Sequence, residues 1–600
     1  MTMSNGAFQK GTWYPLPSNC TRSFTLTWFR CAEYGLVAVT ECISWVLQTE
    51  VQCIQWAWQT LSQCSWWAWL GCLIFTVVTT LVCVAFAVVS VLVCGAFAVV
   101  EWLVCLVWTV ISIIFCLSTA NGGTAFLLTD GTVMMQEYAS LPLFGANWAT
   151  RRWWKLTPDQ TGSYKNGTWS QLADSNLART YFASAVLADG RVVVCGAEYS
   201  DASGTIKEDW NNSCEIYDPV ANTWAPFASP VNPGSVPSVW EEIGDAPCTL
   251  LPNGTLLMGS LDSANVAKLD PSTLTWTAMT PRPGVGTSDE DSWVLMPDRT
   301  IAAPSCQNPP TTWVYDITTD LWHQGNSLPV SIIDVVNETG PALLRYDGTA
   351  FFLGGNQHTA VYSPVSSPKW SNGPDLPDQD GKKIGIVDGP AALMVNGNIL
   401  FSAGQINDKG DWSSPCWFFE FDGTTFNRTG DPPNNDCPSY STRLLLLPNG
   451  DILFCREGDS SFYAYQSDAA APQDSFRPVI QVCPTNIVPG TTIQISGLQF
   501  NGLSQAVAYG DDSQTATNYP LVRIVNKQSG HVRYCRTFNH TTVDGSGNVI
   551  PSMGVATGSA VITTNVVIPD DIELGDSSVF VVANGIPSQP FDAAIWPILV

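Results

Sequence analysis

The sequence has little of what nucleic-acid-binding or redox-metal proteins usually need. Its 600 residues include only four histidines, and 26 basic residues stand against 52 acidic ones, for a net charge of −26. So acidic a chain is repelled by nucleic acid and by anionic lipid surfaces, whereas it suits cations or basic ligands. None of its 19 cysteines forms a Cys-x-x-Cys pair. The cysteine spacing therefore argues against a zinc or iron–sulfur framework.

Charge and proline are both scarce in the N-terminal fifth of the chain. The charged residues of 1–120 are Lys10, Arg22, Arg30, Glu33, Glu41, Glu50 and Glu101. No proline lies between Pro17 and Pro142. Residues 1–19 form a polar segment without the apolar run of a signal peptide. With Ser18-Asn19 as a start and Asn121-Gly122-Gly123 as a stop, the pattern predicts one α-helix over 20–120, about 145 Å long.

Cysteines recur along this predicted helix at a fixed interval. They occupy positions 20, 31, 42, 53 and 64 and, after one step of eight, positions 72, 83, 94, 105 and 116. Eleven residues over three turns favour a right-handed coiled coil, so we expect a homo-oligomer. Small residues share the cysteine side and form a close-packing helix seam. From residue 72 this seam consists of Cys72, Thr76, Cys83, Ala87, Ser90, Cys94, Ala98, Glu101, Cys105, Thr109, Ser112 and Cys116.

The seam residues admit more than one role. The cysteines are interpreted as small apolar packing residues, with interchain disulfides and metal or redox conduction as alternatives. Glu101 is either a protonated carboxylate that hydrogen-bonds across the seam or a proton or ion site.

The face opposite the seam predicts a membrane boundary. It carries glutamine and glutamate up to about residue 65 and aliphatic side chains afterwards, with Trp66, Trp67 and Trp69 at the change. We therefore expect residues 66–118 to be embedded in a lipid bilayer. This stretch exceeds the ~20 residues of one crossing. A single crossing is favoured, with the N-terminus cytoplasmic and the remainder extracellular; the alternative is two crossings with a turn near Gly95 or Glu101.

After Gly123 the sequence changes to short apolar runs separated by turns. Aspartate or asparagine, usually followed by glycine, recurs at Asp130-Gly131, Asp189-Gly190, Asn253-Gly254, Asp298-Arg299, Asp347-Gly348, Asn396-Gly397 and Asn449-Gly450. Several units end in a tryptophan, as at Trp224, Trp276 and Trp322. The fold class is therefore mainly β: a seven-bladed kelch-type β-propeller over 121–472. Alternating strands over 473–600 predict an immunoglobulin-like β-sandwich.

This arrangement resembles the galactose oxidase and glyoxal oxidase family of copper radical oxidases. The segment Ala178-Arg-Thr-Tyr181 looks like the family's radical-tyrosine segment, and Ser439-Tyr440-Ser441 looks like its axial-tyrosine segment. The resemblance implies two histidine ligands, but the matching positions hold Ser441 and the run Asp511-Asp-Ser-Gln514-Thr. Near the expected cross-linking cysteine stands Thr124, and the stacking tryptophan matches Tyr199. Without imidazoles we expect no copper site and no catalytic residues, and no cofactor is predicted, although calcium is possible.

Acidic residues mark a candidate ligand site instead. Several aspartates lie shortly before apolar runs, where the propeller would point them toward its axis; calcium or a cationic group would suit them. The candidate residues are Tyr181, Asp245, Asp291, Asp388, Asp436 and Tyr440, and the two tyrosines would offer stacking surfaces for a glycan. The alternative is that these acids are solvated loop residues or turn caps and that the tyrosines are structural.

Three functions follow from these features. The favoured one is a non-catalytic, membrane-anchored, homo-oligomeric scaffold that displays propeller heads for adhesion, surface assembly or the binding of a glycan or protein ligand. The second is an enzyme, either a divergent oxidase or a hydrolase that uses mouth carboxylates. The third is an ion-conducting or signalling membrane coiled coil built on the seam and Glu101.

Overall fold

A computed structural model describes the β-rich part of the chain. The described residues are 11–17, 77, 120–140, 147–204, 206–231, 239–284, 286–406, 409, 413–468, 471–505, 507–508 and 517–596. The predicted seam residues and Glu101 lie outside these ranges, as does the expected coiled-coil helix apart from Val77. Among the described residues, no helix has the length and apolarity needed to span a bilayer.

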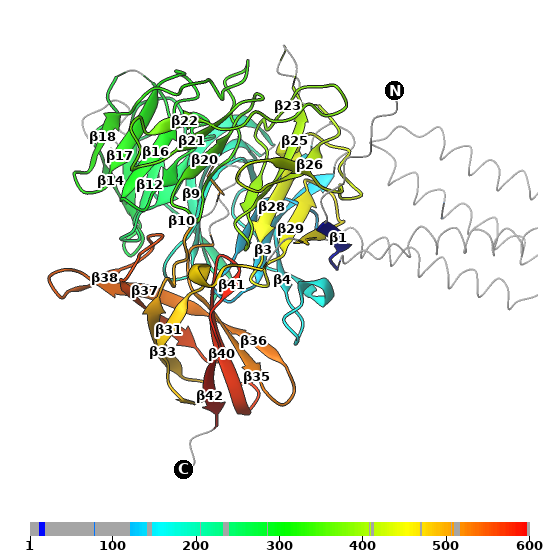
Figure 1. The fold of residues 1–600 in the computed structure, drawn as a ribbon, viewed down its shortest axis with the longest axis vertical. Helices are drawn as coiled ribbons and strands as arrows, with labels where there is room; N and C mark the ends of the chain where they lie inside the picture. Colours follow the sequence, from blue (N-terminus) through cyan, green and yellow to red (C-terminus); the bar gives the residue numbers. More distant parts are fainter. Residues whose placement is uncertain are drawn as a thin grey trace, which may run out of the picture. The chain divides into compact units, whose positions relative to one another are not determined.

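The described chain is mainly β, as predicted, and its residues 120–468 form seven antiparallel sheets in sequence order (Figure 1). The first sheet contains β2 (Ala125–Leu127), β3 (Val133–Ser140), β4 (Asn147–Thr157) and β5 (Thr168–Gln171). The second contains β6 (Arg179–Thr180), β7 (Ala183–Val186), β8 (Val192–Ser200), β9 (Lys207–Asp218) and β10 (Thr223–Phe227). The third contains β11 (Cys248–Leu250), β12 (Leu256–Gly259), β13 (Val266–Asp270) and β14 (Thr275–Ala278).

The remaining sheets continue the pattern. The fourth contains β15 (Val294–Leu295), β16 (Thr300–Pro304), β17 (Thr312–Asp316) and β18 (Leu321–Gln324). The fifth contains β19 (Ala342–Leu344), β20 (Ala350–Leu353), β21 (Thr359–Tyr362) and β22 (Trp370–Asn372). The sixth contains β23 (Ile384–Gly385), β24 (Ala391–Leu393), β25 (Ile399–Gln405), β26 (Trp417–Phe421) and β27 (Phe426–Arg428). The seventh contains β28 (Thr442–Leu446), β29 (Ile452–Arg456) and β30 (Tyr463–Ser467).

The predicted turns explain why these sheets form. Each turn lies between two adjacent strands of one sheet, and its second residue has a left-handed φ between 66° and 92°. That conformation suits glycine, which six of the seven turns place there. The preceding side chain caps the turn: Asp130 and Asp347 each accept the backbone N–H two residues on at 3.0 Å. The seven hairpins predicted from sequence are confirmed.

Adjacent sheets touch through the strands that lead each hairpin. Strand β28 contacts both β24 and β2, β19 contacts β15 and β24, and β7 contacts β11. At the opposite side of several sheets, a tryptophan packs on a neighbouring tyrosine, with ring centroids 5.1 Å apart for Tyr217 and Trp224 and 5.2 Å apart for Tyr315 and Trp322. Cys195 and Cys214 form a disulfide between β8 and β9. The other seven cysteines of the described residues are free and buried.

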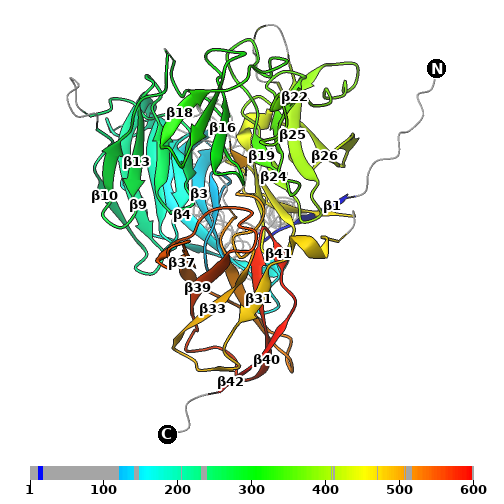
Figure 2. The same cartoon turned by 60° about the vertical axis from the view of Figure 1, so that its left-hand side comes forward.

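The seventh sheet takes its fourth strand from the start of the chain. Strand β1 (Gly11–Pro15) pairs antiparallel with β30, from Gly11 opposite Ser467 to Pro15 opposite Tyr463 (Figures 1 and 2). The indole of Trp13 packs on Phe418, Phe454 and Tyr465, and its Nε1 donates to the Gly430 carbonyl at 2.6 Å. Residues 1–19, expected as a separate polar segment, therefore contribute a strand to the β-sheet body.

Residues 473–596 form two further sheets that share one hydrophobic core (Figure 2). One contains β31 (Val479–Val482), β33 (Thr492–Leu498), β37 (Thr537–Val543), β38 (Val549–Pro551) and β39 (Val561–Val567). The other contains β32 (Asn486–Ile487), β35 (Leu521–Asn526), β36 (Val532–Cys535), β40 (Gly575–Ala583), β41 (Ile586–Pro587) and β42 (Phe591–Ile595). Polar contacts tie this sandwich to the seven-sheet part, which together with β1 we call the head. The Thr537 N–H donates to the Thr129 carbonyl at 3.0 Å, and β34 (Val507–Ala508) pairs with β19.

Candidate functional site

Five half-buried carboxylates converge at one end of the head, and we call them the mouth cluster: Asp245, Asp289, Glu290, Glu338 and Asp388. They come from the loops before β11, β15, β19 and β24, so four successive sheets contribute. They form two triads that share Glu290, one with Asp245 and Asp289 and one with Glu338 and Asp388. Within each triad, one ligating oxygen per residue lies within 4.8 Å of the others.

The backbone fixes the position of these side chains. Glu290 and Asp388 both adopt left-handed conformations, with φ of 57° and 50°, that non-glycine residues rarely take. The Glu290 N–H donates to the Asp245 carbonyl at 3.2 Å, and the Asp388 N–H donates to the Thr339 carbonyl at 3.2 Å. The Cys306 thiol donates to the Glu290 carbonyl at 2.9 Å. Neighbouring loops are thus cross-braced where the acids meet.

The cluster creates a strongly negative local field. Burial, with the nearby charge of Asp291 adding to it, raises the pKa of Asp289 to about 6. Asp289 also accepts a hydrogen bond from Gln307 Nε2 at 2.6 Å. The pKa of the buried Cys306 thiol lies well above its ordinary value because of burial and the surrounding carboxylates. A bound cation would relieve this repulsion.

Two buried hydroxyl groups flank the acids in sequence. Ser288 precedes Asp289 and Thr339 follows Glu338, and their side chains are 0% and 2% exposed. Neither hydroxyl oxygen has a hydrogen-bond partner among the described residues. Buried polar groups normally have one. The clustered carboxylate oxygens themselves supply the hard-ligand chemistry that calcium prefers.

Tyr440, and Tyr199 next to the predicted Tyr181, interact electrostatically with acids of the cluster. Tyr181 has a left-handed φ of 51°, and its ring stands edge-on to Tyr199 with centroids 6.3 Å apart. Burial, followed by the charge of Glu198, raises the pKa of Tyr199, and Asp245 adds to the shift. Burial raises the pKa of Tyr440 to about 12, with Glu457 and Asp388 adding to the shift. The phenols of Tyr199 and Tyr440 are thus neutral and electrostatically linked to members of the cluster.

Two predicted aspartates have other roles. Asp291 is fully buried, pairs with Arg282 at 2.5 Å and accepts the Cys306 N–H at 3.0 Å. It belongs to the packed body of the fourth sheet, where a carboxylate needs a partner. Asp436 is an exposed side chain that pairs with Arg456 on the surface. Of the four predicted aspartates, Asp245 and Asp388 belong to the mouth cluster.

Sequence reasoning missed Asp289, Glu290 and Glu338. The signal was present in the run Ser288-Asp289-Glu290-Asp291, from which the prediction chose the last acid because it lies closest to the apolar strand. Because Asp291 lies so close to the strand, its side chain is buried in the fold instead of joining the cluster. Glu290 adopts a left-handed φ, and a glutamate in the sequence does not predict that conformation.

Copper does not fit the residues present. All four histidines are described: His323 is exposed on β18, and His358 pairs with Asp375 at 2.8 Å. His531 pairs with Glu573 at 3.0 Å in the sandwich, and His540 is fully buried there beside Thr564. None belongs to the mouth cluster. Ser441, at the position where the resemblance implies a histidine, donates its hydroxyl to the Pro438 carbonyl at 3.0 Å. Residues 511–515 lie outside the described residues.

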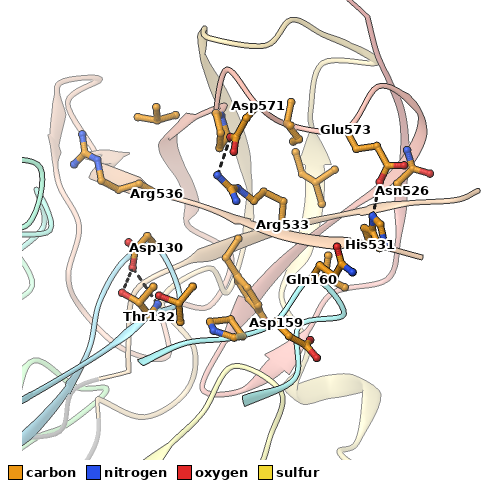
Figure 3. A pocket seen from close by; sticks show the side chains of 18 of the residues that line it. Asp130, Thr132, Asp159, Gln160, Asn526, His531, Arg533, Arg536, Asp571 and Glu573 are labelled. Carbon is orange, nitrogen blue, oxygen red and sulfur yellow. Dashed lines mark hydrogen bonds and ion pairs between the residues drawn. The ribbon is translucent and has the colours of Figure 1, made fainter. Parts of the chain in front are cut away.

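A separate cavity of about 590 Å³ lies between the first sheet and the sandwich (Figure 3). Its charged side chains largely satisfy one another: Arg533 pairs with Asp571 at 2.8 Å, and His531 faces Glu573. Asp130 caps its own turn through Thr132. This cavity has matched charges, in contrast to the mouth cluster.

Comparisons with known proteins give only weak structural matches. No family model matches the sequence, and no curated protein does. A copper-bound fungal alcohol oxidase of the AA5 family matches with a TM-score of 0.43 and 13% identity, over 78% of this chain and 96% of that one. The extracellular domain of a putative hybrid two-component system from B. thetaiotaomicron matches with a TM-score of 0.38 and 10% identity, over 79% of this chain and 56% of that one. PorZ, a surface component of the type-IX secretion system of Porphyromonas gingivalis, matches with a TM-score of 0.37 and 9% identity, over 79% of this chain and 59% of that one. Likenesses at this level assign no function.

Proposed function

We propose that this chain is a non-catalytic, membrane-anchored scaffold whose head binds a cationic ligand, with calcium as its simplest form, at the mouth cluster. In this proposal the seven sheets are the blades of a closed kelch-type propeller, and the two C-terminal sheets are an immunoglobulin-like sandwich. The seven consecutive sheets of four or five strands, the contacts between hairpin-leading strands and the completion of the last sheet by β1 support the propeller.

The observation that carries the proposal is the donor set of the mouth. The resemblance to copper radical oxidases implies two imidazole ligands. The mouth cluster instead offers five carboxylates, with the neutral phenols of Tyr199 and Tyr440 electrostatically linked to them. Cu(II) favours nitrogen ligands, whereas carboxylate and hydroxyl oxygens favour calcium. A glycan or protein that presents a cationic group, or that binds through calcium, would suit the same surface.

The membrane anchor and the oligomer rest on the sequence of residues 20–120. The apolar run 66–118 and its tryptophan boundary support insertion in a bilayer, and the eleven-residue repeat supports a homo-oligomer.

A purified full-length chain in detergent tests the function against an oxidase. The fragment 120–600 is unsuitable because it lacks β1. Metal content is measured after incubation with Cu(II), and hydrogen peroxide release is measured with primary alcohols and aldehydes. We expect no stoichiometric copper and no peroxide. Stoichiometric copper together with peroxide release would establish the divergent-oxidase alternative.

A further inference from the structure

Two of the free cysteines lie side by side where the sixth sheet meets the seventh. Cys416 directly precedes β26 of the sixth sheet. Cys437 lies in the segment that leads through the single 3₁₀ turn η3 (Ser439–Ser441) to β28 of the seventh. Both side chains belong to one buried cluster, with exposed fractions of 0% and 4%. The two cysteines thus face the same buried space from neighbouring sheets.

Hydrogen bonds hold the two sulfur atoms together. The Cys416 N–H donates to the Asn435 carbonyl at 3.1 Å, and Asn435 Nδ2 donates to the Cys416 carbonyl at 2.7 Å. Cys416 Sγ lies 3.7 Å from the Asn435 carbonyl oxygen, and Cys437 Sγ lies 3.9 Å from that of Asn434. The two thiols also hydrogen-bond to each other. The connection between the two sheets therefore contains a pair of thiols in direct contact.

The pair has the chemistry of a reactive dithiol. The hydrogen bond from Cys416 lowers the pKa of Cys437, and the charge of Arg456 adds to the shift. The same hydrogen bond, together with burial, raises the pKa of Cys416. Cys437 is therefore the attacking group in thiol–disulfide exchange, because the thiolate is the nucleophile. The head also holds the disulfide between Cys195 and Cys214, which is typical of proteins that fold in an oxidising compartment.

We propose that Cys416 and Cys437 are oxidised to a disulfide that joins the sixth sheet to the seventh. The Cys437 sulfur attacks one sulfur of a small disulfide such as oxidised glutathione and releases one thiol. The Cys416 sulfur then attacks Cys437 in this mixed disulfide and releases the second thiol. The two released thiols carry the two protons, so the cysteines are oxidised and the small disulfide is reduced. This bridge would link two sheets, whereas Cys195 and Cys214 join neighbouring strands of one.

Peptide mass spectrometry tests the proposal on the full-length chain in detergent. Trypsin places three cysteines in adjacent peptides with one cysteine each: Cys416 in 410–428, Cys437 in 429–443 and, as the control, Cys455 in 444–456. The chain is equilibrated with oxidised glutathione, denatured and alkylated without a reductant before digestion. We expect the first two peptides to be joined, at the sum of their masses less two hydrogen atoms, and the third to be alkylated. Separate first and second peptides, whether alkylated or carrying glutathione, would overturn the proposal.

Thermal unfolding tests whether the bridge holds the two sheets together. A reductant should lower the melting temperature of the oxidised wild type more than that of Cys416→Ser or Cys437→Ser, because only the wild type loses this bridge. The double variant should respond like either single variant, since one substitution already removes the bridge. Cys483→Ser, a buried thiol of the sandwich, should respond like the wild type. Equal responses of the wild type and Cys416→Ser would contradict a bridge between the sheets.

Discussion

Glu290 and Asp291 are neighbours in sequence, yet they belong to two regions with opposite electrostatics. Asp291 belongs to one of three carboxylate–arginine pairs among the described residues in which both side chains are buried: Arg282 with Asp291 at 2.5 Å, Arg179 with Glu215 at 2.6 Å and Arg443 with Glu457 at 2.7 Å. Glu290 instead joins the mouth cluster, where acids face acids. Charge is neutralised in the buried pairs and concentrated in the mouth cluster, where we propose that a cation binds.

The difference teaches how to separate structural from functional acids in this chain. Removing the arginine of a buried pair lowers the stability of the fold, because the carboxylate is left buried and unpaired. Neutralising a carboxylate that lies among like charges has little effect on stability or raises it, because repulsion is removed. Stability and ligand binding should therefore respond in opposite ways in the two regions.

The largest effect is expected from breaking a buried pair. Arg282→Ala should lower the free energy of unfolding by about 3–5 kcal/mol, since Asp291 is left buried without its cation. Denaturant unfolding of the full chain in detergent measures this. The double variant Arg282→Met with Asp291→Asn should recover much of the loss, because no charge is then buried. An Arg282→Ala variant as stable as the wild type would refute a structural role for the pair.

The sandwich offers a pH-dependent counterpart. Burial lowers the pKa of His540 to about 3, while in the unfolded chain it is near 6.5. Between these values the unfolded state binds the extra proton, so stability falls as pH drops below about 6.5, by about 2 kcal/mol at pH 5 from this group. His540→Gln should lose less stability than the wild type between pH 7 and pH 5. Equal losses in both proteins would contradict the buried, neutral histidine.

Neutralising the shared acid of the mouth should act in the other direction. In calcium-free buffer, Glu290→Gln should raise the free energy of unfolding by about 1 kcal/mol, because it removes like-charge repulsion in both triads. Added calcium should raise the melting temperature of the wild type and not that of the variant. A variant that is destabilised by several kcal/mol would show that Glu290 is a structural acid like Asp291.

The smallest effect is expected at the surface. Asp436→Asn breaks the exposed pair with Arg456 and should change stability by less than about 0.5 kcal/mol. Thermal unfolding beside the wild type measures it. A larger loss would mean that Asp436 supports the loop before Tyr440.

The repeated turns made most of the β fold predictable. A positive φ at positions such as Gly131 and Gly450 favours glycine, so the turn is visible in the sequence. All seven hairpins were predicted from these turn residues. The site was harder, because burial depends on neighbouring sheets. Nothing local distinguishes Asp291, which pairs with Arg282, from Glu290, which belongs to the mouth cluster. The pairing of Gly11–Pro15 with β30 could not be predicted either, because these five residues lie far from β30 in the sequence and do not show the turn pattern of the other strands.

Calcium titration calorimetry on the full-length chain in detergent tests the central claim, that the mouth is a cation-binding site, most directly. The account predicts a saturable calcium-binding step for the wild type that is abolished in Glu290→Gln and retained in the matched variant Asp436→Asn. Equal binding by all three proteins, or no binding by the wild type, would contradict it.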